Sequence, residues 1–113
     1  VIITAYATTG EQWPIEKNIK ADRELKLELE HRGGWLMRIT GYSPSTGHAE
    51  PGWAIKMPFD EACDLGMRYR QDALYHVAED LLSVSHCDDR RALIAIGSFR
   101  ERCRGEEKVG AST

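Results

Sequence analysis

The sequence predicts an α+β protein in which two helices cover one face of a single sheet. Short runs of apolar and β-branched residues recur along the chain, which is typical of strands. Two longer segments rich in helix-forming residues interrupt these runs. The order is strand, helix, strand, strand, helix, strand, strand, strand. This order favours a two-layer sandwich with a mixed or antiparallel sheet of five to six strands.

Size and charge narrow the class of protein. The chain has 113 residues, which is the length of one domain, and we place that domain at residues 1–104 with a polar tail at 105–113. Hydrophobic residues make up 42% and charged residues 29%, which excludes collagen-like and low-complexity chains. No apolar run approaches the roughly 18 residues of a membrane span, so no membrane partner is expected. The net charge of −3 argues against a general nucleic-acid coat.

The cysteines and the first residues indicate the compartment. Three cysteines at wide spacing do not resemble a secreted disulfide framework, and there is no CxxC pair for a zinc knuckle. We interpret Cys63, Cys87 and Cys103 as reduced thiols, mostly used in packing. Residues 1–4 lack the basic and apolar segments of a signal peptide. A cytoplasmic protein without cofactor is therefore expected.

The first strand and helix follow from local patterns. Residues 1–8 are β-branched and aromatic, as in a buried strand. Asn18 is a candidate N-cap for a helix over 19–32, and the glycines at 33–34 supply a left-handed stop. A narrow apolar stripe marks the face of this helix toward the core: Ala21, Leu25 and Leu29.

Two strands and a loop are expected next. Residues 35–42 alternate as a strand, and residues 43–52 form a loop because they contain two prolines and two glycines. Residues 53–57 return as a short strand. Its inward side chains are Trp53, Ile55 and Met57.

The second helix is predicted over residues 60–71, with Asp60 as its cap. Gly66 costs about 1 kcal/mol in a helix interior relative to alanine. We expect close packing on the sheet to compensate for it.

A hairpin closes the predicted fold. Residues 73–87 alternate on both sides of a turn at Glu79 and Asp80, followed by a charged turn at 88–91 and a last strand at 93–96. The turn sets the cross-strand pairs: Val77 with Leu82, Tyr75 with Val84, and Ala73 with His86.

Three segments carry a resemblance to a known family. Residues 39–44 look like an ITAxNP segment, residues 69–75 resemble a QxAxF helix-to-strand junction, and residues 96–99 match a hydrophobic-Gly-Ser-Phe element. In this order, over residues 1–102, they resemble a family of small bacterial proteins catalogued as a domain of unknown function, number thirty-two ninety-three. Gly41 replaces the usual alanine and Ser43 the usual asparagine. The resemblance implies a fold and a bacterial origin, and no established activity.

Polar and aromatic side chains around the 43–53 loop are candidates for binding. His48 and Glu50 could act as a base with an orienting carboxylate, or lie on a solvated connection. Gln71, at the end of the second helix, could join a ligand site or satisfy buried backbone. The candidate binding set is Thr40, Tyr42, His48, Glu50, Trp53 and Gln71.

Five arginines form a second candidate site, for anions: Arg90, Arg91, Arg100, Arg102 and Arg104. Residues 90–104 carry a net charge of +4, which leaves −7 for the rest of the chain. If residues 98–104 are extended, the last three arginines project to one side and suit phosphate or carboxylate. The alternative is a charged edge strand that discourages aggregation.

Metal and nucleotide chemistry receive no support from motifs. His76 and His86 fall on opposite faces of the predicted hairpin, which disfavours joint metal ligation. GxxxxGK[ST], GxGxxG and GxSxG are absent, so no catalytic residue is assigned.

The sequence therefore favours a non-enzymatic binding or regulatory module that contacts a protein or an anionic partner. One alternative is a small enzyme of unknown class, with His48, Glu50 and Gln71 around a pocket near the 43–53 loop. The other is binding of a nucleic-acid backbone through the arginine-rich edge.

Overall fold

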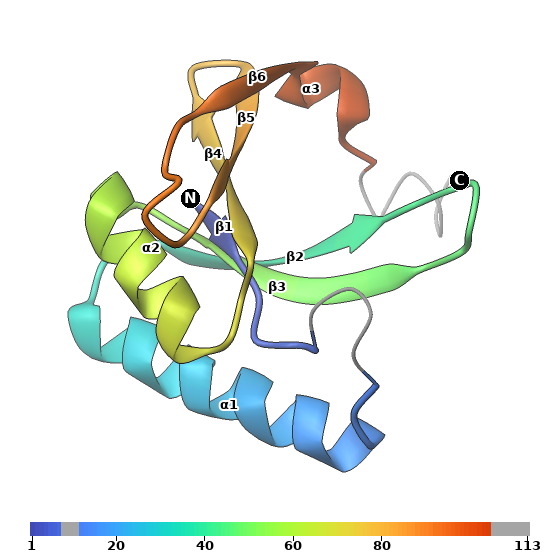
Figure 1. The fold of residues 1–113 in the computed structure, drawn as a ribbon, viewed down its shortest axis with the longest axis vertical. Helices are drawn as coiled ribbons and strands as arrows, with labels where there is room; N and C mark the ends of the chain where they lie inside the picture. The colour runs from blue at the N-terminus through green and yellow to red at the C-terminus, as the bar shows by residue number, and fades with distance from the viewer. Residues whose placement is uncertain (8–11, 105–113) are drawn as a thin grey trace.

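The computed structural model describes residues 1–7 and 12–104. Within these residues, six strands form one antiparallel sheet in the order β2-β3-β1-β4-β5-β6, and helices α1 and α2 lie on the same face of it (Figure 1). The elements are β1 (Ile2–Ile3), α1 (Ile15–Arg32), β2 (Leu36–Tyr42), β3 (Ala49–Ile55), α2 (Phe59–Arg68), β4 (Ala73–Ala78), β5 (Leu81–His86), β6 (Ile94–Ser98) and α3 (Phe99–Arg102). The predicted fold class and element order are confirmed, and α3 is an addition.

The core lies between the sheet and the two helices. Leu25 and Leu29 of α1 are fully buried, which confirms the predicted apolar stripe, and Ala21 packs partly buried beside them. The other buried members of this cluster are Ile3, Ala5, Trp53, Ile55 and Leu65. No helix in the described part of the chain is long and apolar enough to cross a membrane.

The N-terminus of α1 differs from the prediction. The helix begins at Ile15, directly after Pro14, so the assignment of Asn18 as N-cap is wrong. Proline is favoured at helix starts because its fixed φ suits the first turn. The Oδ1 of Asn18 instead accepts a hydrogen bond from the backbone N–H of Ala7 at 2.9 Å. Asn18 thereby ties the chain leaving β1 to α1. The predicted stop is confirmed, since Gly33 has a φ of +77°.

Strand β3 begins earlier than predicted. Residues 49–52 were expected in a loop, but they pair with residues 39–42 of β2. Pro51 lies opposite Thr40, and β1 pairs with β3 only at Trp53 and Ala54. Pro51 is therefore ladder-paired with β2 alone, and on its other side its carbonyl oxygen accepts from the Thr4 hydroxyl at 2.7 Å. Proline is tolerated there because its missing N–H interrupts no strand ladder. The pairing overrides the local turn signals, and the true loop covers residues 43–48.

The hairpin prediction is confirmed in its register. Val77 pairs with Leu82, and the other two predicted pairs are also present. The turn at Glu79 and Asp80 joins β4 to β5 directly, and Glu79 has the positive φ of 56° that a tight hairpin turn needs. His76 and His86 lie on opposite faces of the sheet, as expected.

Helix α2 packs its glycine against β5. The helix begins at Phe59 after Pro58, so Asp60 is not its N-cap and that prediction is wrong. A Cβ placed on Gly66 would lie 2.7 Å from the Sγ of Cys87, just beyond β5. The expected close packing at Gly66 is therefore present, and it depends on this thiol.

Replacing Gly66 with alanine is expected to destabilise the protein by about 1–2 kcal/mol, because the added methyl overlaps the Cys87 thiol. In a Cys87→Ala background the same substitution is expected to be neutral, or stabilising by up to about 1 kcal/mol, since alanine is the better helix former. Urea unfolding of the four proteins measures this cycle. Additive effects of the two substitutions would contradict the packing explanation.

Candidate functional site

The three family-like segments do not meet at one pocket. Residues 39–44 lie on β2 and its loop, whereas residues 96–99 lie on β6 and the start of α3. β2 and β6 are at opposite ends of the sheet order, with four strands between them. Residues 69–75 join α2 to β4 in the middle of the molecule. The candidate binding residues are accordingly dispersed.

Gln71 is used by the backbone around it. Its side chain is buried, and Nε2 donates to the carbonyl oxygens of Tyr6 at 2.8 Å and Tyr69 at 3.1 Å. This arrangement matches the interpretation that Gln71 satisfies buried backbone. Thr40 and Tyr42 are exposed on β2, and Trp53 is buried in the core.

His48 and Glu50 do lie together. The Nε2 of His48 is 3.3 Å from Oε2 of Glu50, and both side chains line an open cleft of about 260 Å³. The other lining residues are Tyr6, Ala7, Gln12, Trp13 and Asn18. A histidine paired with a carboxylate can exchange protons, but among the residues that the structure describes, no serine, threonine or cysteine lines this cleft as a nucleophile.

The C-terminal arginines are arranged differently from the expected extended row. Residues 99–102 form α3, with Ser98 as its N-cap accepting from the N–H of Glu101 at 3.2 Å. Asp80 accepts hydrogen bonds from the Ser98 hydroxyl and from the N–H of Arg100, and these bonds lower the pKa of Asp80. The Ser-x-x-Glu spacing is a capping signal that could have revealed this helix.

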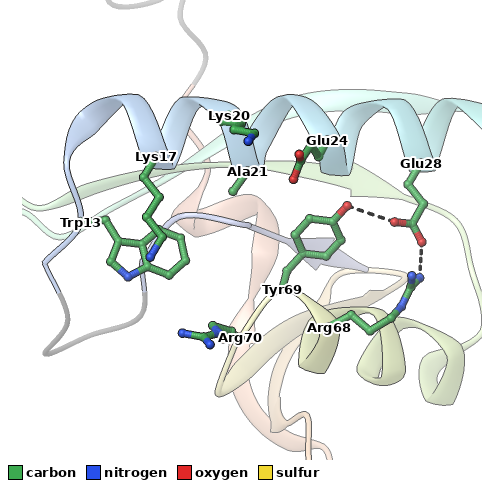
Figure 2. Close-up of a pocket in the computed structure, with 9 residues that line it drawn as sticks. All are labelled: Trp13, Lys17, Lys20, Ala21, Glu24, Glu28, Arg68, Tyr69 and Arg70. Carbon is green, nitrogen blue, oxygen red and sulfur yellow. Dashed lines mark hydrogen bonds and ion pairs between the residues drawn. The ribbon is translucent and has the colours of Figure 1, made fainter.

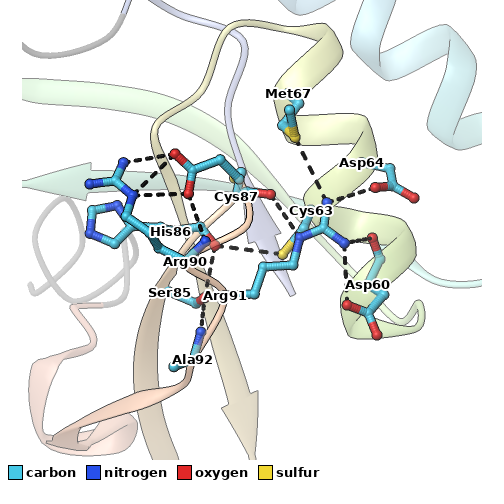
Figure 3. Close-up of polar contacts among 11 residues, drawn as sticks. Asp60, Cys63, Asp64, Met67, Ser85, His86, Cys87, Arg90, Arg91 and Ala92 are labelled. Atoms are coloured by element: carbon cyan, nitrogen blue, oxygen red, sulfur yellow. Dashed lines mark hydrogen bonds and ion pairs between the residues drawn. The ribbon is translucent and has the colours of Figure 1, made fainter.

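Arg90 and Arg91 have internal partners (Figure 3). Arg90 binds the carboxylate of Asp88, and this hydrogen bond lowers the pKa of Asp88 to about 2. Arg91 lies between β5 and α2, where Nη2 donates to Asp64 at 2.6 Å and Nη1 to Asp60 at 3.2 Å. Its Nε donates to the carbonyl oxygen of Cys87 at 2.8 Å. Arg91 therefore holds α2 against the end of the hairpin.

The two thiols next to Arg91 are packing groups. Cys63 and Cys87 are fully buried and free, and burial raises the pKa of both, that of Cys87 to about 12. A thiol with a raised pKa is a poor nucleophile at neutral pH. Cys103 is free and exposed.

Sequence reasoning missed an open groove between α1 and the end of α2 (Figure 2). The groove has a volume of about 570 Å³. Its lining residues are Trp13, Lys17, Lys20, Ala21, Glu24, Glu28, Arg68, Tyr69 and Arg70. At one end, Glu28 forms an ion pair with Arg68 and accepts from the Tyr69 hydroxyl at 3.0 Å. Burial and this hydrogen bond raise the pKa of Tyr69 to about 12.

The other end of the groove gathers cations. The ammonium of Lys17 lies 4.1 Å from the centre of the Trp13 ring. Lys20 and Arg70 lie on opposite walls in Figure 2. Within residues 1–7 and 12–104, neither of these two side chains has an ion pair or hydrogen bond. Glu24 is the remaining carboxylate, since Glu28 is neutralised by Arg68.

The backbone of Arg70 is strained. Arg70 N–H donates to the Met67 carbonyl and Gln71 N–H to that of Gly66, which is the Schellman closure of a helix. The residue at this position adopts a left-handed conformation and is usually glycine, but here it is Arg70 with a φ of +60°. The cost is about 1 kcal/mol. The missing glycine after the second helix is the one sequence signal that could have drawn attention to Arg70.

The fold and its clefts define a small α+β protein with a cationic groove between its two helices. A family model described as a protein of unknown function, DUF3293, matches residues 3–74. This match covers more than half of the chain, so the chain belongs to this family, as the resemblance implied. No curated protein and no solved structure matches the chain significantly.

Proposed function

We propose that this protein is a non-enzymatic binding module for an anionic partner, and that the groove between α1 and the end of α2 is its binding site. The observation that supports the proposal most strongly is the conformation and environment of Arg70. Its backbone is held in a costly conformation, and its guanidinium has no partner among the described residues. Strained residues cluster at functional sites, where the strain is retained for what the side chain does.

The charge of the groove supports the same class of partner. Lys17, Lys20 and Arg70 outnumber the single uncompensated carboxylate of Glu24, in a chain whose net charge is −3. A guanidinium binds carboxylate or phosphate through two parallel hydrogen bonds, and an ammonium on the opposite wall adds a point charge. The groove therefore suits a partner that presents a carboxylate or phosphate group.

The experiment compares binding and stability of Arg70 variants. Arg70→Gly is expected to raise the free energy of unfolding by about 1 kcal/mol and to weaken pyrophosphate or polyglutamate binding by about tenfold or more. The Arg70→Ala protein should also bind the probes more weakly, but its free energy of unfolding should stay near that of the wild type. Calorimetric titration and urea unfolding measure the two quantities.

The control is Arg23→Ala, which removes the same charge from an exposed position of α1 outside the groove. It should leave binding within about twofold of wild type. If the Arg23 and Arg70 variants lose the same amount of binding affinity, the effect comes from net charge alone, which would contradict a specific site at the groove. Failure of both probes to bind the wild type would also count against the proposal.

The two alternative functions receive less support. Arg90 and Arg91 are occupied by carboxylates, which weakens an arginine surface for a nucleic-acid backbone. His48 and Glu50 are adjacent, but the amide of Gln71, the third member of the hypothetical enzyme site, is bonded to backbone carbonyls.

A further inference from the structure

Strand β2 has an unprotected edge. It is seven residues long and forms one end of the sheet, and in the part of the chain that the structure describes no strand pairs with its outer side (Figure 1). Proteins usually protect such edges with lysine, proline, a bulge or a covering segment, because free N–H and C=O groups invite another strand. β2 contains no lysine or proline, and it pairs with β3 over all seven residues without a bulge.

Arg38, the one charged residue of β2, does not cover the outer edge of the strand. The guanidinium of Arg38 is held by Asp22, with Nη2 at 2.6 Å from Oδ2, and lies 3.9 Å from the centre of the Trp53 ring. Both partners are in the body of the protein, on α1 and β3. Arg38 therefore points back over the sheet instead of across its outer edge.

The opposite edge of the same sheet shows the protection that β2 lacks. β6 has five residues, and its pairing with β5 is interrupted by an irregularity at Leu82 and Ser83. The side chain of Arg102 from α3 folds back over this strand, so that a Cβ on Gly97 would lie 2.7 Å from its Nη1. Nη1 also donates to the carbonyl oxygen of Ser98 at 3.3 Å. Within residues 1–7 and 12–104, then, one edge of the sheet is bulged and covered, and the other has no strand on its outer side.

Large apolar side chains are exposed along the open edge. Trp35 is 56% exposed, Met37 50% and Tyr42 65%. Isolated exposed apolar residues are common on surfaces, but these three lie in or directly before one strand, β2, whose outer edge has no strand beside it among the described residues. An occupant of this edge would bury apolar side chains as well as satisfy backbone groups.

We propose that β2 pairs antiparallel with β2 of a second copy of this chain, around a two-fold axis at Ile39. Antiparallel pairing of identical strands is isologous, so it closes as a dimer and leaves no further open edge at this place. The register centred on Ile39 is the one that pairs all seven residues of both strands. It joins the two sheets into one continuous sheet.

The side chains favour this register. Arg38 lies opposite Thr40 of the second copy, and Met37 lies opposite Gly41, so no like charges meet and the large side chain faces a small residue. A register centred on Arg38 would place two guanidinium groups opposite each other. A register centred on Ile39 places two isoleucines in contact instead.

Sedimentation from micromolar to millimolar concentration tests the proposal. Wild type is expected to sediment as a dimer of the 12.8 kDa chain at the upper concentrations. Ile39→Lys, which places two ammonium groups opposite each other, and Met37→Lys should each weaken dimerisation by about tenfold or more. The matched control is Leu27→Lys on α1, which replaces a similarly exposed apolar residue away from β2 and should not change the dimer.

Cross-linking tests the register. In a Cys103→Ser background, Ile39→Cys should form a disulfide-linked dimer in oxidised glutathione, because residues directly opposite in an antiparallel pair have Cα atoms about 4.5–5.5 Å apart. Met37→Cys should not, because its counterpart is Gly41. A wild type that stays monomeric, a dimer that neither lysine variant weakens, or equal cross-linking at the two positions would overturn the proposal.

Discussion

Replacing Asp22 with alanine is expected to lower the free energy of unfolding by about 3 kcal/mol. Asp22 is 8% exposed, and its carboxylate accepts from Arg38 Nη1 at 2.9 Å and Nη2 at 2.6 Å. It also accepts from the Trp53 indole N–H at 3.1 Å. The substitution leaves the buried indole N–H of Trp53 without its acceptor, and such an unpaired donor carries the full cost of desolvation. It also removes both charge-assisted hydrogen bonds of the Arg38 guanidinium, whose side chain is 43% exposed. Urea unfolding monitored by circular dichroism measures the loss.

Two variants separate the charge from the hydrogen bonds. Asp22→Asn retains an acceptor of the same size for Trp53 but removes the ion pair with Arg38, so an intermediate loss is expected. Glu30→Ala removes an exposed carboxylate from the same helix and should change stability by less than about 0.5 kcal/mol. Equal losses in the Asp22→Ala and Glu30→Ala proteins would show that Asp22 contributes no buried bond.

Replacing Gly52 with alanine is expected to cost about 3 kcal/mol. Its Cβ would lie 2.7 Å from the carbonyl oxygen of Ile3 and 3.3 Å from the Cβ of Thr4. The carbonyl belongs to the backbone of β1, which cannot move aside as the end of a flexible side chain can. β1 pairs with β3 on one side and β4 on the other, so a shift of β1 disturbs both halves of the sheet.

The control for this substitution lies on the neighbouring strand. The nearest atom to a Cβ on Gly41 is the Glu50 carbonyl oxygen at 3.9 Å, an ordinary contact. Gly41→Ala is therefore expected to change the free energy of unfolding by less than about 1 kcal/mol. If the two glycine substitutions have the same effect under urea, the close approach of β1 to Gly52 is not what requires glycine there.

The sequence predicted correctly those elements that depend on residues close together in the chain. The register of the β4–β5 hairpin follows from alternation on both sides of a two-residue turn, and Leu25 and Leu29 follow from helical spacing. Asp22 was missed because a carboxylate on a charged helix is usually solvated. Its partners, Arg38 and Trp53, come from strands that only the folded chain brings beside it.

The wrong and missing predictions also arise from contacts between segments that are distant in the sequence. Residues 49–52 carry loop-forming proline and glycine, but pairing with β2 makes them a strand. The groove that we propose as the binding site lies between α1 and the end of α2, two segments that are not adjacent in the sequence, so no sequence motif indicates it. His48 and Glu50 were predicted together because they are two residues apart, whereas Gln71 was grouped with them without any local basis.

The two-residue strand β1 has a consequence for how the chain folds. β2 with β3, and β4 with β5 and β6, are sets of strands that are close in sequence and can form from local contacts. In the sheet formed by the described residues, β1 is the strand that joins them, through the pairs of Ile2 with Ala54 and with Tyr75. Contacts across such long loops form slowly because closing the loop costs chain entropy before any contact repays it. We therefore expect the two sets of strands to form early and the insertion of β1 between them to limit the folding rate.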